Sequence, residues 1–168
     1  IKGLNYRLNT GLTFQHRNRE TYYDETTVNG FTSGGYSNVT NRVNITLLIE
    51  NIINYQKIIG DHSIKFTGLY SYQWDEYKTR ALQSEGFPSH TLTTYQASSG
   101  ALINPSSNLI QTGLVSQMAR INYVYKGKYL VTSTVRRDGY SGFGENTKFG
   151  VFPSVALGWN LSEEDFIG

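Results

Sequence analysis

The feature that most constrains this chain is an alternation of apolar and polar residues over stretches of strand length. In residues 2–17, for example, Leu4, Leu8 and Leu12 share one parity and polar side chains fill most of the other. Successive side chains of a strand point to opposite faces, so such a segment has one apolar and one polar face. The pattern recurs in five further segments, residues 39–55, 63–74, 114–125, 129–137 and 149–160. The sequence therefore predicts an all-β fold of about six long strands.

The connections between these segments alternate in length. Residues 18–38 and 77–112 are long and lack a steady period, whereas the turns at Gly60-Asp61 and Lys126-Gly127 are short. Bacterial outer-membrane β-barrels have this arrangement, with long loops outside the cell and short turns in the periplasm. The segments also reach the length of about 9–11 tilted residues that crosses a bilayer. We therefore predict an antiparallel up-and-down meander that forms part of a larger transmembrane β-barrel.

The apolar faces of the predicted strands suit contact with lipid. We expect ten of these side chains on the convex, lipid-facing side: Leu4, Leu8, Leu12, Val43, Ile45, Leu47, Phe66, Ile121, Val131 and Val155. Aromatic residues gather near the expected strand ends, at Tyr70, Tyr72 and Trp74 on the long-loop side and at Tyr55, Tyr123, Tyr125, Tyr129 and Trp159 on the short-turn side. Two aromatic girdles of this kind are typical of the membrane–water interfaces.

Composition removes several function classes. The net charge of +2 gives no sign of a nucleic-acid partner, and the absence of cysteine excludes disulfides and thiol–metal sites. No apolar run approaches the roughly 18 residues of a membrane helix. The chain opens at Ile1-Lys2-Gly3 directly on a strand pattern, without a signal peptide. The expectation is either a cytosolic protein or an internal fragment of a longer one.

Residues that could carry chemistry are scattered. The three histidines, His16, His62 and His90, have no metal-ligand spacing, and we expect no metal site. The acidic pair Asp75-Glu76 suits a loop mouth, and the run that begins at Ser162 suits a capped helical turn extending to Asp165. No catalytic residue and no cofactor are expected.

The stretch from Ile121 to Trp159 carries a recognisable combination of motifs. An aromatic hairpin, YKGKYLVT, precedes the segment Arg136-Arg137-Asp138-Gly139, and Phe143-Gly144 and then FGVFPSVALGWN follow. In this order the motifs resemble the barrel of the SusC/RagA family of TonB-dependent outer-membrane transporters. The family often carries Arg in the bend where this chain has Gly142, so no role of that Arg is carried over.

The resemblance implies how the chain is organised. Family members have a 22-stranded barrel with a plug domain in the lumen, so about six strands amount to about a quarter of the wall. Residues 1–168 are therefore expected to be one partial barrel domain. The plug, the energy-coupling TonB box and the remaining strands would lie outside it.

The resemblance also implies a function. It predicts TonB-driven import of oligosaccharides or peptides across the cell outer membrane, with a SusD-like surface lipoprotein as partner and no covalent chemistry. The TonB complex would act through the missing N-terminal part, and lipid would surround the wall. Two alternatives stay open from the residues alone: a passive porin-type barrel, and a soluble lipocalin-like ligand-binding barrel.

Particular positions follow from the same reasoning. The resemblance assigns a shared structural motif to six residues, Arg136, Asp138, Gly139, Phe143, Gly144 and Pro153. By parity, Arg120 and Arg136 lie on the polar face and are candidates for the lumen. Because Pro cannot donate to a strand ladder, we expect a bulge or interrupted pairing at Pro153.

The apolar parity also predicts the register of the central hairpin. Odd residues must pair with odd residues across the turn, which requires an odd loop length. A three-residue loop of Tyr125, Lys126 and Gly127 would place Gly127 at a left-handed position and set Tyr123 opposite Tyr129.

Overall fold

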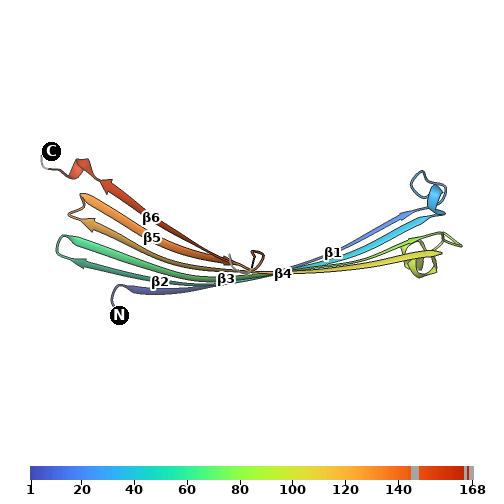
Figure 1. The fold of residues 1–168 in the computed structure, drawn as a ribbon, viewed down its shortest axis with the longest axis horizontal. Coiled ribbons are helices and arrows are strands. Elements are labelled where there is room, and N and C mark those ends of the chain that lie inside the picture. The colour runs from blue at the N-terminus through green and yellow to red at the C-terminus, as the bar shows by residue number, and fades with distance from the viewer. Residues whose placement is uncertain (145–147, 165, 167–168) are drawn as a thin grey trace. The chain divides into compact units, whose positions relative to one another are not determined.

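The computed structural model describes residues 1–144, 148–164 and 166. Its main elements are β1 (Leu4–Tyr23), β2 (Tyr36–Ile59), β3 (His62–Glu85), β4 (Leu102–Tyr125), β5 (Tyr129–Tyr140) and β6 (Phe149–Trp159). They form one sheet in the order β1-β2-β3-β4-β5-β6, so each strand pairs with its neighbours in the chain (Figure 1). The predicted all-β antiparallel meander of six strands is confirmed.

Three short 3-10 helices complete the described structure: η1 (Phe31–Ser33), η2 (Thr93–Ser99) and η3 (Leu161–Glu163). Within the described ranges, no helix has the length and apolar character to cross a membrane. The predicted helical turn near the C-terminus is present as η3, but its cap differs. Asn160 is the N-cap residue without a side-chain capping bond, and the Ser162 hydroxyl donates to Asn160 Oδ1 at 2.9 Å. Asp165, the expected last residue of that turn, lies outside the described residues.

The sheet divides into two compact units. Unit 1 contains residues 1–12, 47–74 and 112–168, and unit 2 contains residues 13–46 and 75–111. In unit 1, the start of β1 and the end of β6 lie at the same end as the two short turns (Figure 1). Unit 2 carries both long connections. The two short turns therefore belong to unit 1 and the two long connections to unit 2, in the alternating order that the sequence predicts.

Strands β1 to β4 are longer than the sequence pattern predicts. β1 continues to Tyr23 instead of ending near Arg17, and β3 continues to Glu85 instead of ending at Trp74. β4 begins at Leu102, so the expected loop 77–112 shrinks to residues 86–101. Alternation in the sequence is visible only where one face of a strand is apolar and the other is polar. The backbone hydrogen bonds of a strand require only a neighbouring strand, whatever the side chains are. Where both faces are polar, the strand continues but the sequence signal ends.

The β4–β5 hairpin confirms the predicted parity but not the predicted loop. Tyr125 opposes Tyr129 and Tyr123 opposes Val131, so odd residues pair with odd residues and the loop is Lys126, Gly127 and Lys128. The predicted pairing of Tyr123 with Tyr129 is wrong by two residues. Its physical reason is the turn: φ is +52° at Lys126 and +71° at Gly127, and the Lys128 N–H donates to the Tyr125 carbonyl at 2.9 Å. Positive φ at both central residues is the signature of a type I′ turn.

This turn geometry predicts opposite effects for two substitutions. Lys126→Asn should stabilise the full-length barrel by about 0.5–1 kcal/mol, because Asn tolerates positive φ better than Lys does. Gly127→Ala should destabilise it by about 1 kcal/mol, although a Cβ there would meet nothing within 4 Å. Urea unfolding of the barrel in lipid vesicles measures both effects. A Gly127→Ala barrel as stable as the wild type would contradict the turn assignment.

Pro153 lies in an uninterrupted ladder, and the predicted bulge is wrong. It opposes Val135 in a β5–β6 register that continues unbroken from Tyr129–Trp159 to Gly139–Phe149. At the two ends of that ladder, Asn160 N–H donates to Lys128 O at 2.7 Å and Tyr140 N–H donates to Lys148 O at 2.9 Å. Both are even–even pairs, and hydrogen-bonded pairs alternate with non-bonded ones, so the odd Pro153 faces away from β5 with its nitrogen. Its missing N–H therefore removes no bond in this sheet.

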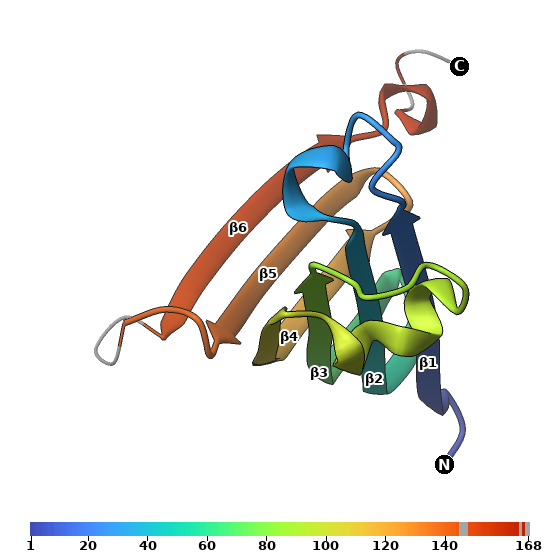
Figure 2. The ribbon, with the colours of Figure 1, turned by 90° about the vertical axis from the view of Figure 1, so that its right-hand side faces the viewer.

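Few side chains of the described residues are fully buried. The buried apolar ones are Phe87 and Ala97, and both belong to the connection between β3 and β4. In unit 2, this connection lies beside the β1–β2 connection at the end of the strands (Figures 1 and 2). The Gly86 and Phe87 N–H groups donate to the carbonyls of Gly35 and Gly34 at 3.2 and 3.0 Å. The two long connections therefore form a small packed body of their own.

Candidate functional site

The register of β4, β5 and β6 assigns their side chains to two contrasting faces. On the face of odd residues, Tyr123, Val131 and Leu157 lie in one row across the three strands, and Ile121, Ser133 and Val155 lie in the next. On the face of even residues, Arg120 lies beside Thr134 and Ser154, and Asn122 beside Thr132 and Ala156. The odd face is apolar and aromatic, although many of its side chains are exposed: Val155 by 69% and Leu157 by 79%. An apolar face this open to its surroundings suits an apolar medium rather than water.

The predicted residues Arg136 and Asp138 form an ion pair on the even face of β5. Arg136 Nε donates to both carboxylate oxygens of Asp138, at 2.9 and 2.8 Å. Arg136 Nη2 also donates to the buried Ser116 hydroxyl of β4 at 3.3 Å. The guanidinium thus ties two strands together through one carboxylate and one hydroxyl. This geometry supports a structural role for the Arg136-x-Asp138 motif, with part of the guanidinium still exposed.

Arg120 lies on the same face but is not part of that pair. Its Nε donates to the Thr134 hydroxyl at 3.1 Å, and one row further along Thr132 donates to Asn122 at 2.9 Å. The polar face of β4 and β5 is therefore a series of cross-strand hydrogen bonds, each of which holds neighbouring strands in register. Arg120 and Arg136 share this face, as the parity predicts.

The bend after β5 explains the remaining motif residues. Gly139 is buried against the ring of Phe149, and a Cβ at Gly139 would collide with that ring. Phe143 packs edge-on against Tyr140 with ring centroids 5.3 Å apart. Gly144 closes the described part of the bend. A hollow of about 400 Å³ lies here, lined by Leu114, Arg136, Asp138, Tyr140, Phe143, Phe149, Gly150 and Phe152.

An aromatic row crosses the short-turn end of unit 1. The rings of Tyr125, Tyr129 and Trp159 stack in sequence, with centroids 6.4 and 6.5 Å apart, and His62 extends the row 4.9 Å from Tyr125. Tyr123, Tyr125, Tyr129 and Trp159, four of the five aromatic residues expected at this end, therefore belong to one set of ring contacts with His62. His62 is exposed at the start of β3, and its Nδ1 lies 2.7 Å from the Tyr123 hydroxyl. On the long-loop side Trp74 is not at a strand end, because β3 continues to Glu85.

Glu164 anchors this aromatic row beyond the end of β6. It accepts hydrogen bonds from Lys128 Nζ at 3.0 Å, the Tyr129 hydroxyl at 2.8 Å and Trp159 Nε1 at 3.0 Å. These bonds, that of Lys128 above all, hold the pKa of the Glu164 carboxyl below its usual range. The carboxylate therefore stays ionised at neutral pH and fixes the polar edges of two aromatic rings.

The other predicted groups fall into separate places. Asp75 and Glu76 are neighbours in β3 and lie on opposite faces. Asp75 accepts from the Thr46 hydroxyl at 2.7 Å, while Glu76 contacts Lys78 at 2.5 Å and so forms a pair of its own. His16 contacts Asn41, and His90 lies 2.5 Å from the Tyr22 hydroxyl. Within the parts of the chain that the structure describes, no group of His, Asp and Glu could hold a metal ion.

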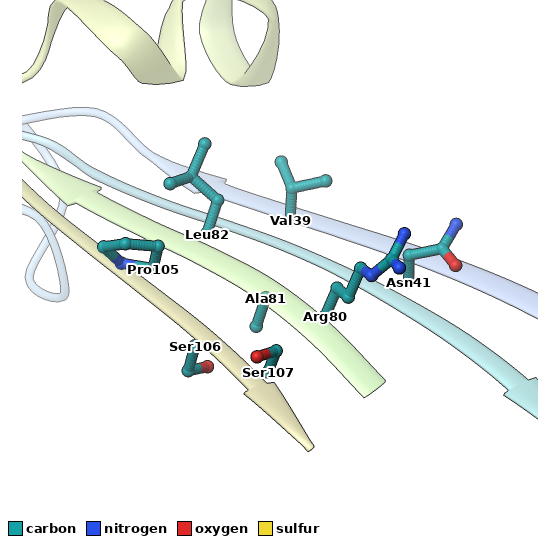
Figure 3. Close-up of a pocket in the computed structure, with 8 residues that line it drawn as sticks. All are labelled: Val39, Asn41, Arg80, Ala81, Leu82, Pro105, Ser106 and Ser107. Atoms are coloured by element: carbon teal, nitrogen blue, oxygen red, sulfur yellow. The ribbon is translucent and has the colours of Figure 1, made fainter. Parts of the chain in front are cut away.

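A further hollow in unit 2 lies on the sheet surface. It measures about 550 Å³ and is lined by Val39, Asn41, Arg80, Ala81, Leu82, Pro105, Ser106 and Ser107. Figure 3 shows Val39 and Leu82 projecting to one side of the sheet and Ala81 to the other. Four of its lining residues, Val39, Ala81, Leu82 and Pro105, are apolar, and Arg80 is its one charged residue.

Sequence reasoning did not identify a cluster of basic residues on β1 and β2. Arg17 and Arg19 of β1 and Arg42 of β2 line one hollow of about 310 Å³ in unit 2. The segment 18–38 carries no apolar alternation and was therefore expected to be loop, which concealed that Arg19 continues a strand face begun by Arg17. The every-second-residue spacing of the two arginines was the signal that could have revealed it.

Proteins of known class are similar in sequence to this chain. No family profile matches it. The TonB-dependent receptor P3 of Formosa agariphila is 33% identical over 168 residues, which cover 99% of this chain and 17% of that protein. The TonB-dependent receptor SusC of Bacteroides thetaiotaomicron is 36% identical over 85 residues, 51% of this chain and 8% of that protein. The chain thus spans 17% of the first relative's length.

A solved structure shares the fold. The RagAB peptide transporter matches with a TM-score of 0.88 and 21% identity, over 99% of this chain and 19% of that chain. The RagAB peptide importer in its closed-closed state matches with a TM-score of 0.76 and 22% identity, again over 99% of this chain and 19% of the other. At this level of identity the match establishes the fold: the six-stranded meander is that of a stretch of a larger β-barrel.

Proposed function

Because this chain belongs to the SusC/RagA family of TonB-dependent receptors, as a segment of their β-barrel, we propose that residues 1–168 form part of the wall of an outer-membrane transporter. In this proposal the apolar face contacts the lipid of the outer membrane, and the polar face lines the lumen. The plug, the TonB box and the other strands belong to the longer protein.

The contrast between the two faces of β4–β6 carries this proposal. Val155 and Leu157 are exposed apolar side chains, whereas Arg120, Thr134 and Asn122 on the other face form cross-strand hydrogen bonds. A transmembrane barrel needs this combination because lipid offers no partner to polar groups, while a lumen holds water. A soluble barrel with an apolar interior would instead turn the same apolar residues inward and away from solvent.

The transported cargo in this proposal is an oligosaccharide or a peptide. Import uses energy delivered by the TonB complex through the N-terminal part of the longer protein, and a SusD-like surface lipoprotein captures the substrate outside. The named functions of the relatives, a TonB-dependent receptor and a peptide transporter, support this class of activity. The wall performs no covalent chemistry and needs no cofactor.

Within the wall, we assign Arg120 and Arg136 to the lumen surface. Arg136, Asp138 and Gly139 hold the strands and the bend in place, because the ion pair crosses to Ser116 and the glycine admits the Phe149 ring. Pro153 lies in the same β5–β6 ladder and does not interrupt it.

Energy-dependent uptake tests the proposed function. Cells that express the full-length transporter as their only route for large substrates are offered labelled oligosaccharides and peptides. Accumulation of one of these substrates should stop when TonB is deleted or a protonophore collapses the proton gradient. Uptake that continues unchanged in the TonB-deleted strain would identify a passive porin and overturn the proposal.

A further inference from the structure

Three arginines lie close together on the polar face of unit 2. Arg17 and Arg19 alternate along β1, and Arg42 lies on the adjacent strand β2; all three side chains are exposed. They line a hollow of about 310 Å³, whose remaining lining is Thr21, Tyr23, Tyr36, Asn38 and Thr40. We call these eight residues the arginine surface. All eight belong to unit 2, so the surface is complete within one compact unit.

The charges of these arginines are not neutralised within the described chain. None of the ion pairs among the described residues includes Arg17, Arg19 or Arg42. By contrast, Arg136 is paired with Asp138, and Lys78 with Glu76. Three like charges on neighbouring strands repel one another, and a wall without a binding role gains nothing from this placement. The arrangement is instead suited to receiving negative charge from a ligand.

The nearby carboxylates are engaged elsewhere. Glu20 projects from the opposite face of β1 and accepts from Asn18 and Thr94. Glu85 accepts from Gln83 at 3.2 Å. Each guanidinium of the arginine surface therefore keeps its fork of N–H donors available, and this fork matches a carboxylate or another planar or tetrahedral oxyanion.

The groups around the arginines suit a sugar. The rings of Tyr23 and Tyr36 lie 6.0 Å apart at one end of the hollow and offer an apolar surface with polar edges. Thr21, Asn38 and Thr40 supply hydroxyl and amide groups that can donate hydrogen bonds to sugar hydroxyls and accept hydrogen bonds from them. Aromatic rings with hydroxyl and amide neighbours bind a sugar's ring face and its hydroxyls at the same time.

A second hollow adjoins the arginine surface along β1 and β2. It measures about 480 Å³, shares Arg17 and Arg42, and is otherwise lined by Phe14, Gln15, His16, Asn44 and Tyr77. β2 is paired on both sides, with β1 and β3, so a ligand on its face meets side chains rather than free backbone groups. A peptide that binds as an added strand needs such a free backbone edge, which this face does not offer. The observations therefore favour a glycan over a peptide.

We infer that the arginine surface binds an anionic oligosaccharide, a sugar chain whose substituents carry negative charge. The inference rests on the proposed transport function and specifies its substrate class. Uronic-acid carboxylates and sulfate esters share the chemistry that three guanidinium groups recognise. Neutral glycans would leave the arginines without partners.

Calorimetric titration of the purified full-length transporter in detergent tests the inference. The probes are a galacturonate oligosaccharide, a sulfated galactan oligosaccharide, a neutral glucan oligosaccharide and polyglutamate. Wild type should bind at least one of the two anionic oligosaccharides, and this binding should weaken as salt rises. The variant Arg17→Gln/Arg19→Gln/Arg42→Gln should lose about tenfold or more in affinity, because several charge-assisted hydrogen bonds disappear together.

A matched variant controls for the change in net charge. Arg7→Gln/Lys57→Gln/Arg80→Gln removes the same three charges from exposed positions that do not line the hollow, and it should bind as the wild type does. Both variants should show the heat-resistant migration of a folded barrel. The uronate and sulfate probes distinguish the two sources of negative charge.

Three outcomes would overturn the inference: neither anionic oligosaccharide binds, the arginine variant binds as tightly as wild type, or polyglutamate binds more tightly than both sugars. The uptake experiment separates this failure from failure of the transport function. TonB-dependent import of a neutral glycan, equal in wild type and arginine variant, would leave the function standing and remove the anionic substrate.

Discussion

Val155→Arg should destabilise the full-length barrel by about 2–4 kcal/mol, as expected for a charge near the bilayer midplane of an outer-membrane barrel. Val155 lies near the middle of β6, in the same row as Ser133, and is 69% exposed on the apolar face. An Arg at this position has no carboxylate opposite it and must either enter lipid or distort the wall. Reversible urea unfolding in lipid vesicles gives the difference in free energy.

Ser154→Arg is the matched control, since it introduces the same side chain one residue away on the other face. Ser154 pairs with Thr134 among the polar residues of β5, where a guanidinium can stay hydrated. This variant should cost much less than Val155→Arg. Equal costs for the two variants would show that the apolar face does not contact lipid, and the membrane orientation proposed above would then fail.

The 168-residue chain expressed alone should aggregate in water. β1 and β6 each pair on one side only, so each leaves a row of unpaired backbone groups at an edge of the sheet. The exposed apolar residues of β6, including Val151, Val155 and Leu157, add an apolar surface through which copies of the chain can associate. Size-exclusion chromatography with light scattering should find large particles without detergent.

Detergent supplies the contrasting condition, because micelles cover the apolar face but leave the backbone edges open. Aggregation should therefore decrease in detergent without giving a single closed species. A monodisperse monomer in plain buffer, with one cooperative thermal transition, would contradict this expectation. Such a chain would have to bury its apolar face against itself, which is the soluble-barrel alternative.

The alternation of residues predicted the strand count and the two faces because both depend on a local contrast. Leu4 to Phe14 on β1 and Phe149 to Trp159 on β6 carry that contrast with one exception each, Thr10 and Phe152, and the structure places strands at both. The ion pair of Arg136 and Asp138 was also accessible, since residues two apart on a strand share a face.

Features that depend on a second strand could not be read from one segment. The pairing of Tyr125 with Tyr129 follows from a turn with positive φ at Lys126, an unusual conformation for Lys that its sequence does not announce. Pro153 interrupts nothing because its nitrogen faces away from β5, and that direction is a property of the register. The sequence identifies Pro153 as a residue without an N–H group, but only the pairing of β5 with β6 shows that no hydrogen bond is lost there.

The extended polar strands of unit 2 escaped prediction for a different reason. Arg19 and Tyr23 lie beyond the last apolar residue of β1, where neither face is apolar and the two-residue period leaves no trace in hydropathy. The arginine surface is built there. Sequence patterns that follow hydrophobicity therefore find the membrane-facing part of such a strand and miss the polar continuation that could hold a ligand.

The packing of the two long connections also bears on how such receptors exchange parts. The backbone of Gly86 and Phe87 donates to Gly35 and Gly34, and His90 meets Tyr22, so neither connection keeps its conformation independently of the other. A chimera that received only one of the two connections from a relative would lack the partner with which that connection forms its hydrogen bonds. The unit of recombination is the pair of loops together with the strand ends that carry them, although β2 and β3 separate the two loops in the sequence.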